Sequence, residues 1–286
     1  MQITNLDAIK PEHRHIFVSP HFDDVAYSCG GALGTLASQG QRPLVITVFA
    51  GLPPFRLNPL TFASKAGRPL AFRVHRGMGF GLAMSFNPAK IVALRRQEDA
   101  RAFDYLQADY LWLDYLDSIY RGHARRYARI QQLLGGEVHP DDRVISEQLS
   151  QSLLRVHTRL PGSTWYFPLG IGRHVDHQLV SAAAQGLIEH GASVQFYEDF
   201  PYVTREGALP ERLHELGSAF LPEQIQIKEA IDQRIAAAAL YASQIKMSFG
   251  DREALGKAIQ NYACSLLPAQ ATPLEQYWLP SSLKTR

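Results

Sequence analysis

Cysteine is scarce in this chain, because only Cys29 and Cys264 occur among its 286 residues. Neither a disulfide scaffold nor a zinc finger built on a cysteine pair is therefore expected. No run approaches 18 apolar residues, so no membrane span is expected. The formal net charge is only +2, which does not indicate a nucleic-acid partner. The opening segment MQITNLDAIKPEHRH lacks the apolar stretch of a secretory signal, so the cytoplasm is the expected compartment.

The composition is that of a globular domain able to bury a core, with 46% hydrophobic and 20% charged residues. Short apolar segments predict buried strands at residues 15–19, 44–49, 110–113, 164–168 and 193–198. Helical patterns are expected at residues 26–39, 90–107, 141–160, 177–190, 222–247 and 251–263.

Strands that alternate with helices favour an α/β fold. We expect a Rossmann-like three-layer sandwich with a mostly parallel central sheet, formed by a single domain over residues 1–286. Two stretches, about residues 52–89 and 114–140, show no hydrophobic periodicity, and we predict that they are long irregular excursions. Excursions of that length are usually functional or disordered.

Two polar clusters follow predicted strands, where sites form in open α/β sheets. They are Pro20-His21-Phe22-Asp23-Asp24 and Gly172-Arg173-His174-Val175-Asp176-His177. Imidazole and carboxylate are good zinc ligands. A tight turn can aim His21 and Asp24 at one ion, and His177 would complete a three-ligand site. Either motif alone is more often a surface or helix-capping feature, so the prediction depends on finding both at strand ends.

The neighbouring polar residues suggest chemistry for such a site. If Asp24 binds the metal, the adjacent Asp23 points elsewhere and is free to act as a general base. His174 would be the partner acid or would stabilise a developing oxyanion. Asp176 would either orient a histidine or cap a helix.

These motifs resemble those of the PIG-L/LmbE family of metal-dependent de-N-acetylases, typically Ala/Pro-His-Pro-Asp-Asp and His-x-Asp-His. The similarity extends in order over about residues 14–245. Its softer matches are Arg95-Arg96-Gln97-Glu98, the segment from Leu113 to Asp117, Tyr197-Glu198-Asp199-Phe200-Pro201-Tyr202, and Tyr241-Ala242-Ser243-Gln244.

The resemblance implies a hydrolase that removes an N-acetyl group from an N-acetylated sugar or related amide. It implies zinc as the cofactor, although iron, cobalt or nickel suit similar ligands. By this resemblance the zinc ligands are His21, Asp24 and His177, Asp23 is the base, and His174 assists the tetrahedral intermediate. Arg95 and Asp117 would lie near the substrate or support the site.

The sequence departs from the family pattern at two positions. Phe22 replaces the common proline of the first motif. Gly172 stands where some members carry a tyrosine, so any oxyanion role of that tyrosine must be filled otherwise, with Arg173 as one candidate.

Basic residues concentrate in both excursions: Arg56, Lys65, Arg68, Arg73, His75 and Arg76 in the first, and Arg121, His123, Arg125, Arg126 and Arg129 in the second. They form either a solvated surface or a lid that attracts an anionic sugar conjugate. The expected partner is thus a small N-acetylated molecule, and the chain could also form a homo-oligomer.

Other functions stay open at this point. A nucleotide-binding Rossmann enzyme would use Gly30-Gly31-Ala32-Leu33-Gly34, but the spacing is not Gly-x-Gly-x-x-Gly and two aspartates precede it. A metal-dependent esterase or phosphoesterase would use the same ligands. A binding protein on this scaffold is disfavoured because every expected catalytic residue is present.

Overall fold

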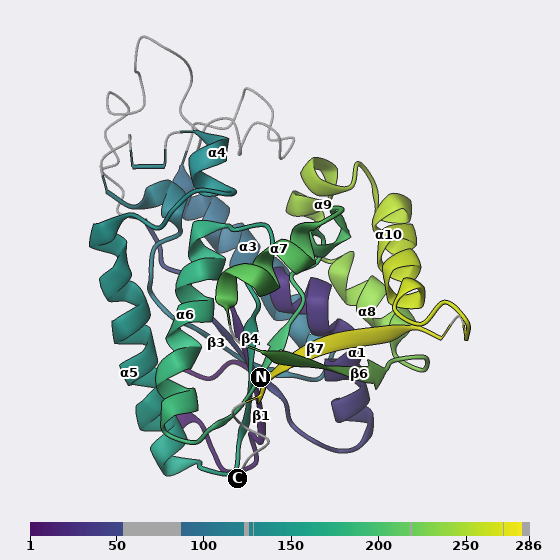
Figure 1. Ribbon diagram of the computed structural model, residues 1–286, viewed down its shortest axis with the longest axis horizontal. Coiled ribbons are helices and arrows are strands. Elements are labelled where there is room, and N and C mark those ends of the chain that lie inside the picture. Colours follow the sequence, from purple (N-terminus) through teal and green to yellow (C-terminus); the bar gives the residue numbers. More distant parts are fainter. Residues whose placement is uncertain (54–86, 123–125, 128, 218, 271, 282–286) are drawn as a thin grey trace.

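The computed structural model describes residues 1–53, 87–122, 126–127, 129–217, 219–270 and 272–281. Within them, seven strands form one sheet in the order β3-β2-β1-β4-β5-β7-β6 (Figure 1). The strands are β1 His15–Ser19, β2 Leu44–Thr47, β3 Asp109–Trp112, β4 Thr164–Pro168, β5 Ser193–Tyr197, β6 Phe220–Gln226 and β7 Leu274–Pro280. The first five are mutually parallel, whereas β7 runs antiparallel to β5 and β6.

Helices cover both faces of this sheet (Figure 1). On one face α1 (Asp24–Ser38) and α3 (Pro88–Tyr105) pack against α8 (Ile231–Ala238). On the other face α5 (Arg143–Arg159) packs against α6 (Val175–Glu189). The shorter elements are η1 Leu6–Ala8, η3 Ser118–Tyr120, α4 Ile130–Leu133, η4 Pro140–Asp142, η5 Tyr202–Thr204, α7 Ala208–Leu216, α9 Ala242–Ser248 and α10 Arg252–Ser265. The expected three-layer α/β sandwich is confirmed.

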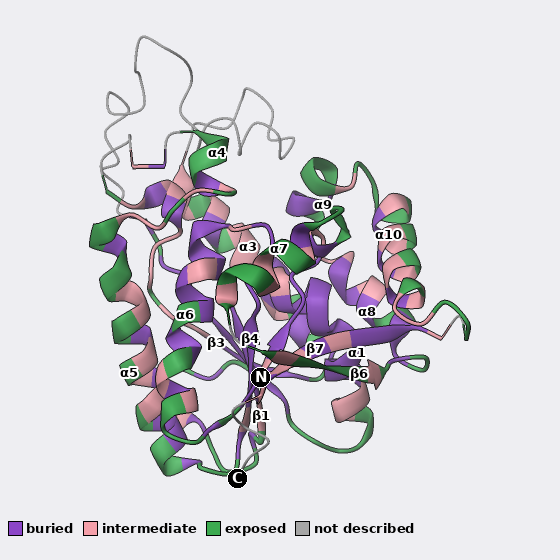
Figure 2. Ribbon diagram, in the orientation of Figure 1, coloured by how far each residue is buried: buried purple, intermediate pink, exposed green. Residues whose placement is uncertain are grey.

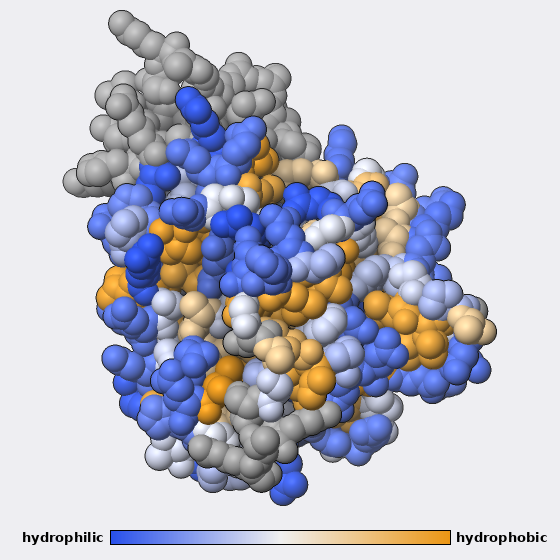
Figure 3. Space-filling view, in the orientation of Figure 1, coloured by the Kyte–Doolittle hydropathy of each residue, from blue (hydrophilic) through white to orange (hydrophobic). Residues whose placement is uncertain are grey.

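The central strands are apolar on both faces because helices cover both. Ile16, Phe17 and Val18 of β1 are fully buried, as is typical of a parallel sheet sandwiched between helices. Figure 2 shows this burial running through the sheet, while the outer sides of α5 and α10 are exposed. On the face drawn in Figure 3, apolar residues form separate patches among polar ones.

The strand order places a switch point between β1 and β4. From β1 the chain proceeds outward through β2 and β3, and from β4 it proceeds in the opposite direction to β5. The connections that leave β1 and β4 at their carboxyl ends therefore diverge, and this leaves a crevice where ligands bind in open α/β sheets. Both polar motifs lie at this crevice, because one follows β1 and the other follows β4.

The helix expected over residues 222–247 is wrong. The structure has β6 at Phe220–Gln226, then the separate helices α8 and α9. Glutamine, glutamate and alanine favour helix locally, but the antiparallel pairing of β6 with β7 prevails. Pro222 fits there because β6 is the terminal strand of the sheet, where a missing N–H is tolerated. Strand β7 was not expected from the sequence.

Two further expectations concern membrane spans and the basic residues of the excursions. Across the described residues, no helix combines the length and apolar character that a bilayer crossing requires. The basic residues from Arg56 to Arg76, with most of the 52–89 excursion, lie outside the described residues. The same holds for His123 and Arg125.

Candidate metal centre

The first motif forms a tight turn at the end of β1. The backbone N–H of His21 donates to Asp24 Oδ2 at 2.8 Å, and His21 Nδ1 lies 3.2 Å from the same oxygen. Asp24 is the first residue of α1, so the helix start fixes its carboxylate beside the imidazole. The spacing of three residues thus brings His21 and Asp24 together, as the sequence predicts.

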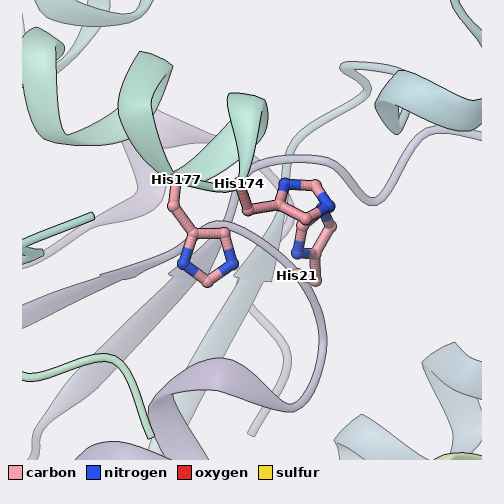
Figure 4. Close-up of side chains that lie close together, drawn as sticks. All are labelled: His21, His174 and His177. Atoms are coloured by element: carbon pink, nitrogen blue, oxygen red, sulfur yellow. The ribbon is translucent and has the colours of Figure 1, made fainter. Parts of the chain in front are cut away.

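The second motif opens helix α6. His174 is its N-cap, and its Nδ1 accepts a hydrogen bond from the N–H of Asp176 at 3.2 Å. His177 follows three residues later, on the same side of the helix. Figure 4 shows both rings reaching from α6 toward His21, which comes from the loop after β1. The ring centroids of the three histidines lie 4.8–5.3 Å apart, and one nitrogen of each lies within 4.8 Å of the others.

Two of these rings are oriented by buried carboxylates. His21 Nε2 lies 3.0 Å from Asp176 Oδ2, and His177 Nδ1 lies 2.7 Å from Asp199 Oδ1. A carboxylate on the far nitrogen is the usual support of a metal-binding histidine, because it fixes the tautomer and the ring orientation. Asp176 therefore supports His21 rather than capping α6, the cap being His174.

The remaining nitrogen of His177 is the observation that best fits a cation. His177 Nε2 is buried and has no hydrogen-bond partner, although it lies 3.3 Å from Asp24 Oδ2. A buried polar atom without a partner needs an explanation. With Nδ1 engaged by Asp199, the Nε2 lone pair, Asp24 and His21 Nδ1 form a donor set of the kind that binds zinc and similar divalent metals.

The carboxylates around the histidines also favour a bound cation. Burial alone would lower the pKa of His177, but Asp24 and Asp199 raise it to about 9. Likewise, despite burial, Asp176 and Asp24 hold the pKa of His21 well above its usual value. The cluster therefore attracts positive charge, which a divalent cation would supply in place of protons.

Asp199 is a site residue for which sequence reasoning assigned no role. Its second oxygen, Oδ2, accepts hydrogen bonds from the backbone N–H groups of Gly170 (2.7 Å) and Ile171 (2.9 Å). Asp199 thus ties the loop after β4 to His177. The available signal was its place just beyond the carboxyl end of β5, the position that the two polar motifs share.

Asp23 lies beside Asp24 but has a different partner. Its Oδ1 accepts from Arg95 on α3 at 2.8 Å. Burial raises the pKa of Asp23, although the Arg95 guanidinium opposes that shift. Phe22 is buried, and the Arg95 guanidinium lies 5.3 Å from its ring centroid. The residue that replaces the family's proline therefore helps to hold Arg95 against Asp23.

A network of buried charges supports Asp176 from behind. Arg121 lies 2.6 Å from Asp176 Oδ1 and 3.0 Å from Asp142 Oδ2. Burial would raise the pKa of Asp176, but Arg121 and the hydrogen bond from His21 hold it below its usual value. Arg126 also pairs with Asp142, at 2.6 Å. These two arginines of the basic 121–129 stretch are therefore neutralised within the protein.

The other predicted residues lie around this centre at different distances. Asp117 Oδ2 is 3.8 Å from His21 Nε2, and its Oδ1 caps η3. The guanidinium of Arg173 pairs with Glu215 on α7 at 3.0 Å, rather than with a group of the cluster. Gly172 adopts a φ of +82° and lies against the ring of Tyr202.

The glycines proposed for nucleotide binding serve another purpose. Gly30, Gly31 and Gly34 lie inside helix α1 rather than in a loop. A Cβ on Gly31 would lie 2.7 Å from Ile227, and one on Gly30 would lie 3.0 Å from Arg234. These glycines allow α8 and its preceding turn to approach α1 closely, so no glycine-rich phosphate loop follows β1.

The fold and the cluster together define an α/β protein with a candidate metal centre at the switch point of its sheet. Residues 16–188 match the model of the PIG-L family, described as GlcNAc-PI de-N-acetylase. The match spans more than half of the chain, so the protein belongs to this family, which confirms the expectation from the motifs.

Named relatives agree with that assignment. The chain is 35% identical over 190 residues to a 2'-N-acetylparomamine deacetylase of Niallia circulans, covering 65% of this chain and 66% of that protein. It is 27% identical over 236 residues to the Streptomyces fradiae protein of the same name, covering 81% of this chain and 73% of the relative. Among solved structures, the zinc-inhibited form of teicoplanin deacetylase Orf2 matches with a TM-score of 0.75 and 26% identity, over 93% of this chain and 97% of that one.

Proposed function

We propose that this protein is a metal-dependent hydrolase that removes the acetyl group from an N-acetylated amino sugar. The observation that carries the proposal is the convergence of His21, Asp24 and His177. Beside them lies the carboxylate of Asp23, which pairs with Arg95 instead of joining this donor set. Family membership supports N-deacetylation, and the names of the two relatives support an amino sugar as the acetylated amine.

The metal would be held by His21 Nδ1, one oxygen of Asp24 and His177 Nε2. Zinc suits this mixture of imidazole and carboxylate ligands, and other divalent transition metals suit it as well. A metal bound there supplies Lewis acidity, which polarises the amide carbonyl and acidifies a water molecule.

Asp23 would act as the general base. Its carboxylate is held by Arg95 through one oxygen, which leaves the other to accept a proton from the attacking water. The amide C–N bond then breaks and the same proton passes to the departing nitrogen, so the products are acetate and a free amine. Arg95 would position Asp23 rather than contact the substrate.

His174 would donate a hydrogen bond from Nε2. Because its Nδ1 accepts from the N–H of Asp176, the proton of the neutral ring resides on Nε2. Burial lowers the pKa of His174, and His21 lowers it further, so the ring stays neutral. A neutral donor stabilises the negative charge that develops on the carbonyl oxygen without having to give up a proton.

The proposed substrate is a small N-acetylated amino sugar. The ion pairs of Arg121 and Arg126 neutralise these two residues of the basic stretch, so neither offers a free charge to an anionic group. We propose the cytoplasm as the compartment, in keeping with a chain that has only two cysteines among 286 residues.

The test is acetate release from 2'-N-acetylparomamine and N-acetylglucosamine by the purified, zinc-loaded chain. We expect one acetate for each amine freed, and loss of turnover in His177→Ala. Turnover of acetate esters without any turnover of the amides would contradict the proposal.

A further inference from the structure

The ring of Tyr202 fills the space that a side chain at residue 172 would need. A Cβ on Gly172 would lie 2.7 Å from Cγ of Tyr202 and 2.8 Å from its Cβ. Tyr202 begins η5 just after Asp199, and the N–H of Val203 donates to the carbonyl oxygen of Asp199 at 3.0 Å. One short turn therefore fixes both Asp199 and Tyr202 at the site.

Tyr202 lies directly against an expected metal ligand. Its ring is perpendicular to that of His177, with the centroids 5.6 Å apart. Burial raises the pKa of the Tyr202 hydroxyl, and the carboxylates of Asp24 and Asp23 raise it further. Among the described residues, none hydrogen-bonds to this hydroxyl. The ring of Tyr202 therefore lies against His177 and residue 172 at the site, and its O–H is available to a substrate.

We propose that the Tyr202 hydroxyl contacts the substrate and donates a hydrogen bond to the acetamide oxygen. This inference rests on the proposed deacetylation. When the water oxygen bonds to the carbonyl carbon, the π electron pair of C=O moves onto the oxygen, and the Tyr202 O–H stabilises that charge. No bond to tyrosine forms or breaks.

A donor to a developing oxyanion affects the transition state more than the bound substrate. Loss of one such donor reduces kcat by roughly 100- to 1,000-fold. If Tyr202 served only to pack against His177, the phenyl ring of Tyr202→Phe would do so equally well, and kcat would not change.

The experiment compares the zinc-loaded wild type with Tyr202→Phe and with Tyr105→Phe, whose tyrosine is 51% exposed. The measurements are kcat and KM for acetate release from 2'-N-acetylparomamine, zinc content, and calorimetric affinity for methylphosphonate, a tetrahedral anion that carries a methyl group. Tyr202→Phe should keep its zinc and its KM within about threefold, lose about 100-fold or more in kcat, and bind methylphosphonate at least about tenfold more weakly.

Two results separate the possible failures. If Tyr202→Phe matches Tyr105→Phe in kcat and in methylphosphonate affinity while both release acetate, the role of Tyr202 is overturned and the proposed function stands. If the wild type neither releases acetate nor binds methylphosphonate, the proposed function fails and this inference fails with it.

Discussion

Asp199 Oδ1 lies 2.7 Å from Nδ1 of His177, and this contact decides which nitrogen of the ring faces Asp24. Because Nδ1 is engaged, the buried Nε2 is left 3.3 Å from Asp24 Oδ2 without a hydrogen bond. The loop after β5 thereby sets the orientation of His177 on α6. His177 then completes a donor set with His21 and Asp24, which follow β1.

Replacing Asp199 with asparagine should weaken metal binding by roughly 10- to 100-fold, because supporting carboxylates fix the tautomer and basicity of ligand histidines. Competition with a chromophoric chelator measures the change. Asp114→Asn is the control, since the Asp114 side chain is 93% exposed. Equal metal affinity in Asp199→Asn and the control would show that His177 does not depend on Asp199 for ligation.

Asp23→Asn should retain the metal but lose roughly 100- to 10,000-fold in kcat, since an amide cannot accept the proton of water. Metal analysis and acetate release on the same preparation check both parts. Retention of near-normal turnover would remove Asp23 as the base. Loss of metal together with activity would instead place Asp23 among the ligands.

Arg121→Met should destabilise the fold, because it leaves the carboxylates of Asp176 and Asp142 buried with one fewer cationic partner. Breaking a buried ion pair from one side reduces the free energy of unfolding by about 3–5 kcal/mol. Urea unfolding measures it, with the exposed Arg155→Met expected to change stability by less than about 0.5 kcal/mol. Comparable midpoints for the two variants would mean that the network contributes little.

Glu198 should make stability depend on pH. Burial raises its pKa from 4.5 to about 7, in opposition to hydrogen bonds from Trp278 and Gln276. A carboxyl whose pKa is raised on folding favours the folded state below pH 4.5, and this contribution is lost as the pH rises to about 7. The loss is about 3 kcal/mol, at 1.36 kcal/mol per pH unit.

The free energy of unfolding of the wild type should therefore fall between pH 4.5 and 7.5 relative to that of Glu198→Gln, which cannot ionise. Chemical denaturation at a series of pH values gives both curves. The exposed Glu229→Gln should follow the wild type. Parallel curves for the wild type and Glu198→Gln would show that Glu198 does not titrate in this window.

Much of this molecule could be predicted from sequence because the determinants are local. The short apolar segments predicted the parallel strands to within about two residues, and the two polar motifs placed His21, Asp24 and His177 at one crevice. What the sequence could not show depends on long-range contact. Strand β6 forms only because β7 pairs with it, against the helix propensity of its residues.

The same reason explains the site residues without a predicted role. Asp199 joins the cluster through its contact with His177, 22 residues away. From the sequence, Arg121 belongs to a basic stretch that forms either a solvated surface or a lid, yet it lies buried between two carboxylates. Tyr202 meets Gly172 only when the loops after β4 and β5 come together. No local pattern encodes such contacts.

The most direct test of the account is acetate release from 2'-N-acetylparomamine after chelation and stepwise return of zinc. The account predicts that the stripped protein is inactive and that activity returns in proportion to metal up to one equivalent per chain. Undiminished acetate release from protein shown by elemental analysis to be free of metal would contradict it.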